Sequence, residues 1–516
     1  MPLSHRHTSA RRSRPTSIVS SYLASHRLQR DTLFGLFSTA LRALLVLFTT
    51  SILVRGLSEE ELGRWSLLIL FTTAGYLGII DLGFHAPVTR RLTLASQNHH
   101  LSMHHPLISW YRRVLLKSLL GFAVLATAIL VIISVQDRGQ SFGALLMTIL
   151  VINLWLIADT LILPIMALLE AREAIIRLRL VEVALRFATL ITTVVAVSID
   201  RSALAVVTGS SLAAAGTLAV SVLLARNSPG SHAQLASNPT PLEVSTPPRT
   251  EWFGALLARL ANTMNWQVSR TITLLTLGFA AAGQLEILIR FQALGVLLTA
   301  GLTGAIFPRL VSASTVESQF GFVLTRTALI VTTALVAFAT FVTINGSLIL
   351  TTWFGSSYQY LTDYLGYIMA TQVITAICST LEIGIVSKAR DEVYAVTRWA
   401  FLVVNSGVTL LLSLRFGLIG VLVGTLASSV FNLFVLLAVY SRVLQIQVKV
   451  HILKPILFGM LGGVVGISAP LVASALGSGS VTIIAVSSVA VLVGATMALH
   501  LGGVGVLPAA RGARSG

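Results

Sequence analysis

The chain has 516 residues, of which 55% are hydrophobic and 11% are charged, and its formal net charge is +17 at pH 7. Soluble domains carry roughly 25% charged residues, so this composition excludes an ordinary soluble protein. It also argues against a nucleic-acid-binding protein, because the basic residues lie in short connections between apolar runs.

The apolar residues form continuous runs, and a helix needs ~20 residues to cross a bilayer. A membrane barrel would show alternating segments of ~10 residues, so strands are not expected. We therefore predict an all-α polytopic membrane protein with about fourteen transmembrane helices. In chain order, the predicted spans are 33–54, 65–86, 114–135, 144–169, 180–199, 203–225, 253–280, 285–307, 322–350, 364–386, 396–414, 418–440, 452–474 and 480–500.

A proline-rich stretch divides the predicted helices into six before it and eight after it. Such a composition is typical of a flexible linker. The sequence therefore predicts two six-helix lobes followed by two extra helices. The predicted parts are a basic cytoplasmic tail (1–32), the first lobe (33–225), the linker (226–251), the second lobe (252–442), two additional helices (443–500) and a cytoplasmic tail (501–516).

Lysine and arginine residues are distributed unevenly between alternate connections, and such residues accumulate on the cytoplasmic side of a membrane protein. If the N-terminus is in the cytoplasm, the inner segments hold 25 of the 36 and the outer segments hold 5. We therefore expect a multi-pass protein of the cytoplasmic (inner) cell membrane, with its N-terminus in the cytoplasm.

Several arginines lie within the predicted spans, where each charge costs ~2.5–3.5 kcal/mol on the insertion scale. Arg42 lies near the middle of the first span, whereas Arg259, Asn262, Trp266 and Arg270 follow one stripe of the seventh. None of these three arginines has an acidic residue three or four positions away. Because the arginine fork suits diphosphate oxygens, the pattern predicts a binding site for an anionic substrate. The alternative is that these arginines pair with carboxylates on other helices.

Two further pairs of opposite charge are spaced four residues apart, as helical ion pairs are. Glu182 precedes Arg186, and Glu286 precedes Arg290. We expect each pair to close along its own helix. Arg290 lies near the outer end of its span and is a substrate-contact candidate of lower rank.

Two acidic residues, Asp159 and Glu382, lie deep in predicted spans without a helical partner. A lone carboxylate at that depth can bind and release a proton or help to bind Na⁺. Both are therefore candidates for ion coupling. The alternatives are a hydrogen-bonded structural acid or an ion pair with an arginine on another helix.

The sequence offers little for catalysis. No Gly-Lys dipeptide occurs, which excludes a phosphate-binding P-loop and a built-in ATPase. His99, His100, His104 and His105 are spaced like helical metal ligands but have no acid nearby, so no metal site is predicted. The longest predicted outer loop, 351–363, contains one acid, which argues against a membrane glycosyltransferase. We predict no enzymatic activity and no cofactor, apart from possible coupling to a proton or Na⁺.

Two segments resemble a known family. The stretch LVRGLSEEELGRW at 53–65, followed by IDLGF at 80–84, is similar to the polysaccharide transporter (O-antigen flippase) family. That family belongs to the superfamily of multidrug, oligosaccharidyl-lipid and polysaccharide exporters. Many relatives carry an acidic residue near the middle of the seventh helix, where this chain has Arg270, so ion coupling through that position is not carried over.

The resemblance implies two lobes around a central cavity, alternating access, and a polyprenyl-diphosphate-linked oligosaccharide carried from the inner to the outer leaflet. The implied partners are this lipid-linked glycan, the membrane and glycan-assembly proteins. A lipid II flippase suits the sequence equally well, whereas a drug or cation antiporter of the same fold should have an acidic cavity. We further expect Arg42 and Arg270 to face each other across the cavity and to share the diphosphate.

Overall fold

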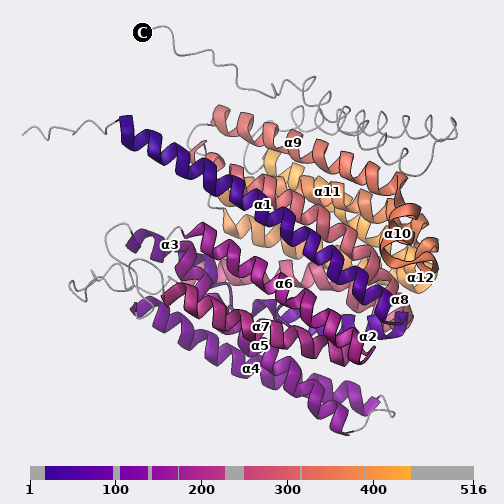
Figure 1. Cartoon of the computed structure of the whole chain (residues 1–516). Helices are drawn as coiled ribbons and strands as arrows, with labels where there is room; N and C mark the ends of the chain where they lie inside the picture. The colour runs from indigo at the N-terminus through magenta and orange to yellow at the C-terminus, as the bar shows by residue number, and fades with distance from the viewer. Residues whose placement is uncertain are drawn as a thin grey trace, which may run out of the picture.

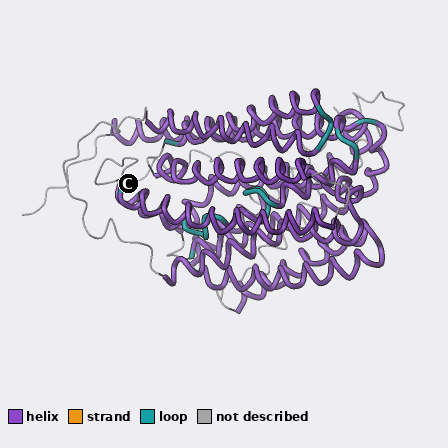
Figure 2. The backbone as a smooth tube through the Cα atoms, turned by 90° about the horizontal axis from the view of Figure 1, so that it is seen from below, coloured by secondary structure: helices purple, strands orange, loops and turns teal. Residues whose placement is uncertain are grey.

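The computed structural model is helical wherever the chain is described, with short turns between helices and no strand in those ranges (Figure 2). The predicted all-α fold class is therefore confirmed. Predicted helices thirteen and fourteen, the C-terminal tail, most of the linker and the start of the N-terminal tail lie outside the described residues. The described residues are 18–96, 105–136, 142–171, 174–226, 249–313, 317–388 and 390–442.

Residues 18–226 form one group of helices, called the N-lobe here, which occupies the lower part of Figure 1 with α1 along its upper edge. The helix α1 begins well before the predicted span 33–54. The elements are α1 (Ile18–Gly56), α2 (Glu59–Leu70), the 3₁₀ helix η1 (Tyr76–Ile79), α3 (His85–Ser96), α4 (Pro106–Gln136), α5 (Phe142–Ala171), α6 (Ile175–Ile199) and α7 (Ala203–Arg226).

Residues 249–442 form the second group, called the C-lobe here, in the upper part of Figure 1. The predicted span 322–350 is interrupted at Asn345, which lies between two helices. The elements are α8 (Arg249–Ala313), α9 (Glu317–Ile344), α10 (Gly346–Phe354), the 3₁₀ helix η2 (Ser356–Leu361), α11 (Thr362–Ser387) and α12 (Asp391–Arg442).

Nine helices in the described part of the chain are long and apolar enough to cross a membrane. Two of them, α8 and α12, contain a sharp turn, at Gly278 (φ 83°) and Gly417 (φ 61°). Arg270 and Glu286 would be about 24 Å apart along a straight helix. They lie in hydrogen-bond contact instead, so α8 folds back on itself. Both turns sit at positive φ, where glycine avoids the Cβ clash.

The predicted second span, 65–86, is wrong as a continuous helix. The helix α2 begins at the N-cap Ser58, whose Oγ accepts from the Glu61 amide at 3.2 Å, and ends at Leu70. Residues 71–84, called the break here, run through the short helix η1 and through Leu82 at φ 47°. Non-helical backbone at membrane depth is tolerated where protein or a cavity surrounds it, and α8 packs against this segment.

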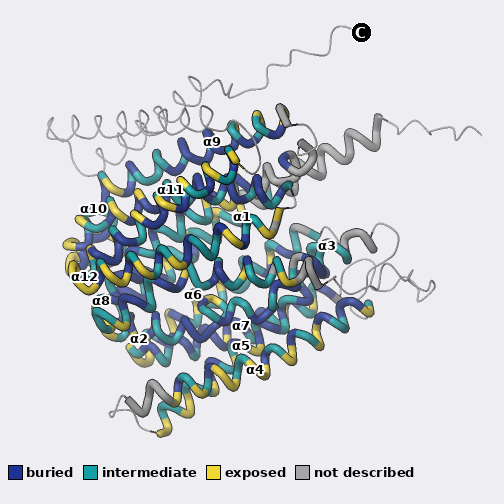
Figure 3. The backbone as a smooth tube through the Cα atoms, turned by 180° about the vertical axis from the view of Figure 1, so that it is seen from behind, coloured by how far each residue is buried: buried dark blue, intermediate teal, exposed yellow. Residues whose placement is uncertain are grey.

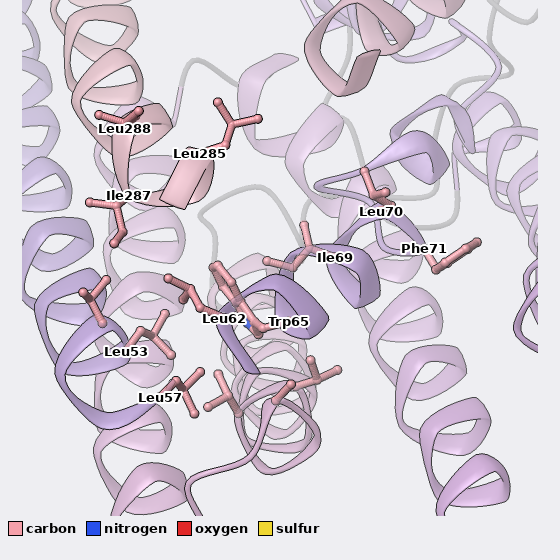
Figure 4. Packing of buried hydrophobic residues seen from close by; sticks show 14 of the residues in the cluster. Leu53, Leu57, Leu62, Trp65, Ile69, Leu70, Phe71, Leu285, Ile287 and Leu288 are labelled. Carbon is pink, nitrogen blue, oxygen red and sulfur yellow. The ribbon is translucent and has the colours of Figure 1, made fainter. Parts of the chain in front are cut away.

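A large apolar cluster joins the lobes where α1 and α2 pack against α8. Figure 4 shows Leu53 of α1 and Leu57, which follows the end of α1, beside Leu62 and Trp65 of α2. Apolar side chains on the outer surface, such as Leu275, are exposed, and the outward face of α4 is among the most exposed in Figure 3. This inside-out pattern suits a protein surrounded by lipid.

One end of the molecule is closed by contacts between the lobes. The Arg55 side chain donates to the carbonyl oxygens of Thr352 and Trp353 at the end of α10, the Trp353 distance being 3.0 Å. Glu59 accepts from the Gln284 side chain at 3.0 Å and from the Tyr360 hydroxyl at 2.8 Å. The two lobes are therefore tied together beyond the apolar cluster.

Candidate functional site

Two cavities meet at the break in the second predicted helix. A cavity of about 480 Å³, called the N-lobe cavity, lies between the break, α1, α5 and α6. A cavity of about 380 Å³, called the C-lobe cavity, lies between the break, α8, α11 and α12. Five residues line both cavities: Thr73, Ala74, Gly78, Arg259 and Arg270.

The polar stripe expected on the seventh span is confirmed as one face. Arg259, Asn262, Trp266 and Arg270 all line the C-lobe cavity. Arg259 donates from Nη2 to the carbonyl oxygen of Gly78 at 3.1 Å, so it holds the break.

The charge of Arg270 is balanced by a buried carboxylate, which corrects the expectation that this arginine is unpaired. Glu286, only 2% exposed, accepts from Arg270 Nε at 2.9 Å and Nη2 at 3.1 Å. Its Oε1 also lies 2.7 Å from Arg290 Nη2, which confirms the predicted Glu286–Arg290 pair. Two arginines thus share one carboxylate, and both line the N-lobe cavity. The group keeps a net positive charge there.

Arg42 does not face Arg270 across a cavity, and that expectation is wrong. Its Nη1 lies 2.6 Å from the Glu182 carboxylate of the neighbouring helix α6, and Arg42 lines neither cavity. The Glu182 carboxylate also pairs with Arg179, whose Nη1 lies 2.8 Å from Glu182 Oε2. The predicted Glu182–Arg186 pair is therefore wrong too, because Glu182 turns to these two arginines instead.

Arg186 is the residue that sequence reasoning missed. It is exposed and lines the N-lobe cavity. Among the described residues, it makes no ion pair and no hydrogen bond. Its i,i+4 spacing from Glu182 suggested a closed pair, whereas its depth in an apolar span was the signal that pointed the other way.

Asp159 is the candidate coupling acid that does line a cavity. Its Oδ2 accepts from the Trp155 indole at 2.9 Å and from the Thr73 hydroxyl of the break. No arginine or lysine of the described chain lies within ion-pair distance of it. Asp159 therefore connects α5 to the break by a hydrogen bond rather than by a salt bridge.

Glu382 has an arginine partner on another helix, the alternative to ion coupling that the sequence left open, and it lies away from both cavities. Its carboxylate pairs with the Arg398 guanidinium of α12 inside the C-lobe, and both side chains are buried. The partner lies 16 residues further along the chain, on another helix, so helical spacing could not reveal it.

By sequence, the chain matches no protein-family model and no curated protein. Its structure is similar to the lipid II flippase MurJ in an inward closed conformation, with a TM-score of 0.66 and 14% identity over 91% of this chain and 99% of that one. It is also similar to a multidrug resistance MATE family transporter of the MOP superfamily. The inward-facing form gives a TM-score of 0.55 at 15% identity, covering 81% of this chain and 99% of that one.

The chain shares the fold of these flippase and transporter structures. The outward-facing form of the MATE transporter gives a TM-score of 0.53 at 14% identity, over 80% of this chain and 95% of that one. At such low identity the likeness concerns the fold. It fits the multi-pass membrane protein that the sequence predicted.

Proposed function

We propose that this protein is a flippase that moves a polyprenyl-diphosphate-linked oligosaccharide from the inner to the outer leaflet of the cytoplasmic membrane. The observation that carries the proposal is the arginine-rich wall of the N-lobe cavity. The charged residues that line this cavity are four arginines and two aspartates. One of the four arginines, Arg186, has no ion-pair or hydrogen-bond partner among the described residues.

A diphosphate is the anion that this wall suits. The guanidinium fork binds two phosphate oxygens at once, and a low-dielectric cavity strengthens the contact. Arg270 and Arg290 are held in place by Glu286, so they present fixed donors with one carboxylate between them. Arg186 adds a charge that nothing nearby neutralises by contact.

The apolar part of the same cavity suits the first units of the lipid chain. Val46 and Leu53 of α1, together with Ile162, Leu163 and Met166 of α5, line it beside the arginines. Such a mixture of apolar surface and a few placed charges is typical of small-molecule sites. A cation carrier is disfavoured, because a drug cation would meet four guanidinium groups here.

A lipid II flippase is the second candidate, favoured by the likeness to MurJ over 91% of this chain. The two candidates share the polyprenyl diphosphate and differ in the glycan. We further propose that the N-terminus is cytoplasmic and that glycan-assembly proteins deliver the substrate. Asp159 is the coupling acid that its place in the cavity favours, whereas Glu382, balanced by Arg398, is assigned a structural role.

A flip assay in proteoliposomes tests the proposal. The substrate is a fluorescent polyprenyl diphosphate that carries one N-acetylglucosamine, and the readout is the rate at which it moves between the two leaflets of the vesicle. Arg186→Ala should reduce the initial rate by about tenfold or more, since a hydrogen bond to a charged group contributes ~1.5–3 kcal/mol. Arg186→Lys should give an intermediate rate, because the charge stays and the fork is lost.

The matched control is Arg113→Ala, which removes an exposed arginine that donates only to its own helix, at Ser109. Its rate should equal that of the wild type. If Arg186→Ala flips the substrate at the wild-type rate and is reconstituted in equal amount, the N-lobe cavity does not hold the diphosphate.

A further inference from the structure

The C-lobe cavity differs in chemistry from its neighbour. Besides Arg259 and Arg270 on the wall shared with the N-lobe cavity, its polar lining consists of neutral amides, hydroxyls and one indole, and no carboxylate lines it. The volume of about 380 Å³ falls within the ~300–1,000 Å³ of small-molecule sites. The two arginines are paired with Asp81 and Glu286, neither of which lines this cavity, and the rest of the polar lining is uncharged. That part of the cavity suits an uncharged, hydroxyl-rich ligand.

Most polar groups of this pocket already have partners. The Gln267 amide donates to Ala74 at 3.1 Å, Asn265 donates to Ala261 at 2.9 Å, and Ser269 bonds to Thr425 at 3.0 Å. These contacts fix the walls rather than leave groups for a ligand.

Four polar side chains of the pocket have no hydrogen bond to any described residue: Asn262, Thr263, Trp266 and Gln292. Thr263 is buried, which leaves Asn262, Trp266 and Gln292 open to a ligand. Trp266 is 39% exposed although it lies on a cavity wall. Because its N–H donates to no described residue, the indole has both an apolar ring face and a hydrogen-bond donor available to a ligand in the cavity.

The three side chains lie at one level of the molecule. Asn262 and Trp266 are one helical turn apart on the first limb of α8. The contact between Arg270 and Glu286 shows that the second limb runs back beside the first from Gly278. Gln292 lies 14 residues after Gly278, and residue 264 lies 14 residues before it. Gln292 is therefore level with the part of the first limb between Asn262 and Trp266. The three groups therefore line one small patch.

We propose that this patch, Asn262, Trp266 and Gln292, binds the sugar attached to the diphosphate, an uncharged hexose of the N-acetylated type. The inference rests on the proposed function and assigns one part of the substrate to each cavity. An amide both donates and accepts, so two amides can pair with sugar hydroxyls and an acetamido group. The open indole face offers an apolar platform for the ring C–H groups.

The arrangement places the bond between sugar and diphosphate over the break. Arg270 lines both cavities, and Thr73 and Gly78 of the break line both as well. A substrate with its diphosphate at Arg186 and Arg290 therefore reaches the C-lobe cavity past Arg270. Its sugar enters a pocket that holds no competing carboxylate.

Equilibrium binding to the purified full-length chain in lipid nanodiscs tests this assignment. One probe is polyprenyl diphosphate, and the other is the same lipid bearing one N-acetylglucosamine. The wild type should bind the sugar-bearing probe roughly fivefold more tightly, the gain of about one or two net hydrogen bonds. Trp266→Ala, Asn262→Ala and Gln292→Ala should each reduce that preference while leaving the affinity for the bare lipid unchanged.

Phe253→Ala is the matched control. Phe253 is an exposed aromatic residue of the same helix, and its side chain lines neither cavity. The variant should keep the full preference. Trp266→Phe keeps an aromatic face and should retain part of the preference, which separates stacking from a folding defect.

Three outcomes would overturn the inference, and they differ in what they say about the proposed function. If the wild type binds both probes equally and Arg186→Ala weakens both, the diphosphate site stands and the sugar patch is wrong. If neither probe binds, or binding does not depend on Arg186, the proposed function fails together with the patch. A loss of affinity for both probes on Trp266→Ala, at unchanged thermal stability, also contradicts a sugar-specific role.

Discussion

The two cavities are neighbours, yet their polar linings differ in charge. The N-lobe cavity holds charges: four arginines, two aspartates, and Glu286 behind two of the arginines. Apart from Arg259 and Arg270, which line both cavities, the polar lining of the C-lobe cavity consists of amides and hydroxyls around one indole. A buried charge needs a partner or a charged ligand, whereas a neutral amide can wait for either water or a hydroxyl. The difference indicates a substrate with a charged part and a neutral part.

Substitution of Glu286 should have the largest effect on the difference between the two cavities. Glu286→Gln leaves Arg270 and Arg290 without their shared carboxylate, and removing one member of a buried ion pair typically costs ~3–5 kcal/mol. The unfolding temperature of the purified protein should fall markedly. The fraction that stays folded should bind polyprenyl diphosphate more tightly, because the N-lobe cavity has become more positive.

Glu382→Gln is the matched control for this variant. It breaks a buried pair of the same kind, with Arg398, at a place that lines neither cavity. It should lower the unfolding temperature and leave lipid affinity unchanged. A change of affinity on Glu382→Gln, or none on Glu286→Gln, would contradict the assignment of the charged part to the N-lobe cavity.

Asp159→Asn sharpens the comparison with a smaller effect. The amide can still accept from Trp155 and from Thr73, so the break should stay in place. One negative charge leaves the cavity wall, and affinity for polyprenyl diphosphate should rise by about threefold, as expected for a partly screened charge. Flipping driven by a proton or Na⁺ gradient should fall toward the rate without a gradient. Gradient-driven flipping at the wild-type rate would remove Asp159 from coupling.

Much of the fold could be predicted from hydrophobic runs, because lipid forces every spanning segment to be helical. The break could not, since residues 71–84 remain mostly apolar and are read as a continuation of the helix. The helix ends at Leu70, and the backbone later passes through Leu82 at φ 47°. A single aliphatic residue in that conformation has no signature in composition.

The site shows the same limit for charges. Spacing along one helix correctly predicted that Arg259 and Arg270 share a face with Asn262 and Trp266, since that depends only on helical geometry. Ion pairs depend on which helices pack together. Glu182 lies close to arginines of α1 and α6, and it pairs with Arg42 of α1, which lies far away in the sequence.

The consequence of that pairing is the unpartnered Arg186. Local spacing offered Glu182 two arginines, one at three residues and one at four, and the structure pairs it with Arg179. Tertiary packing then supplies Arg42 and leaves Arg186 to the cavity. Arg186, to which we assign the largest role in binding, is therefore a residue whose charge helical spacing alone would pair with Glu182.

The most direct test of the two-part substrate site is an electron cryo-microscopy map of the full-length protein in nanodiscs with polyprenyl-diphosphate-linked N-acetylglucosamine bound. We predict density for the diphosphate within hydrogen-bond distance of Arg186 and Arg290, and density for the sugar ring against the Trp266 indole. Diphosphate density in the C-lobe cavity, or a sugar lying among the arginines of the N-lobe cavity, would contradict the assignment.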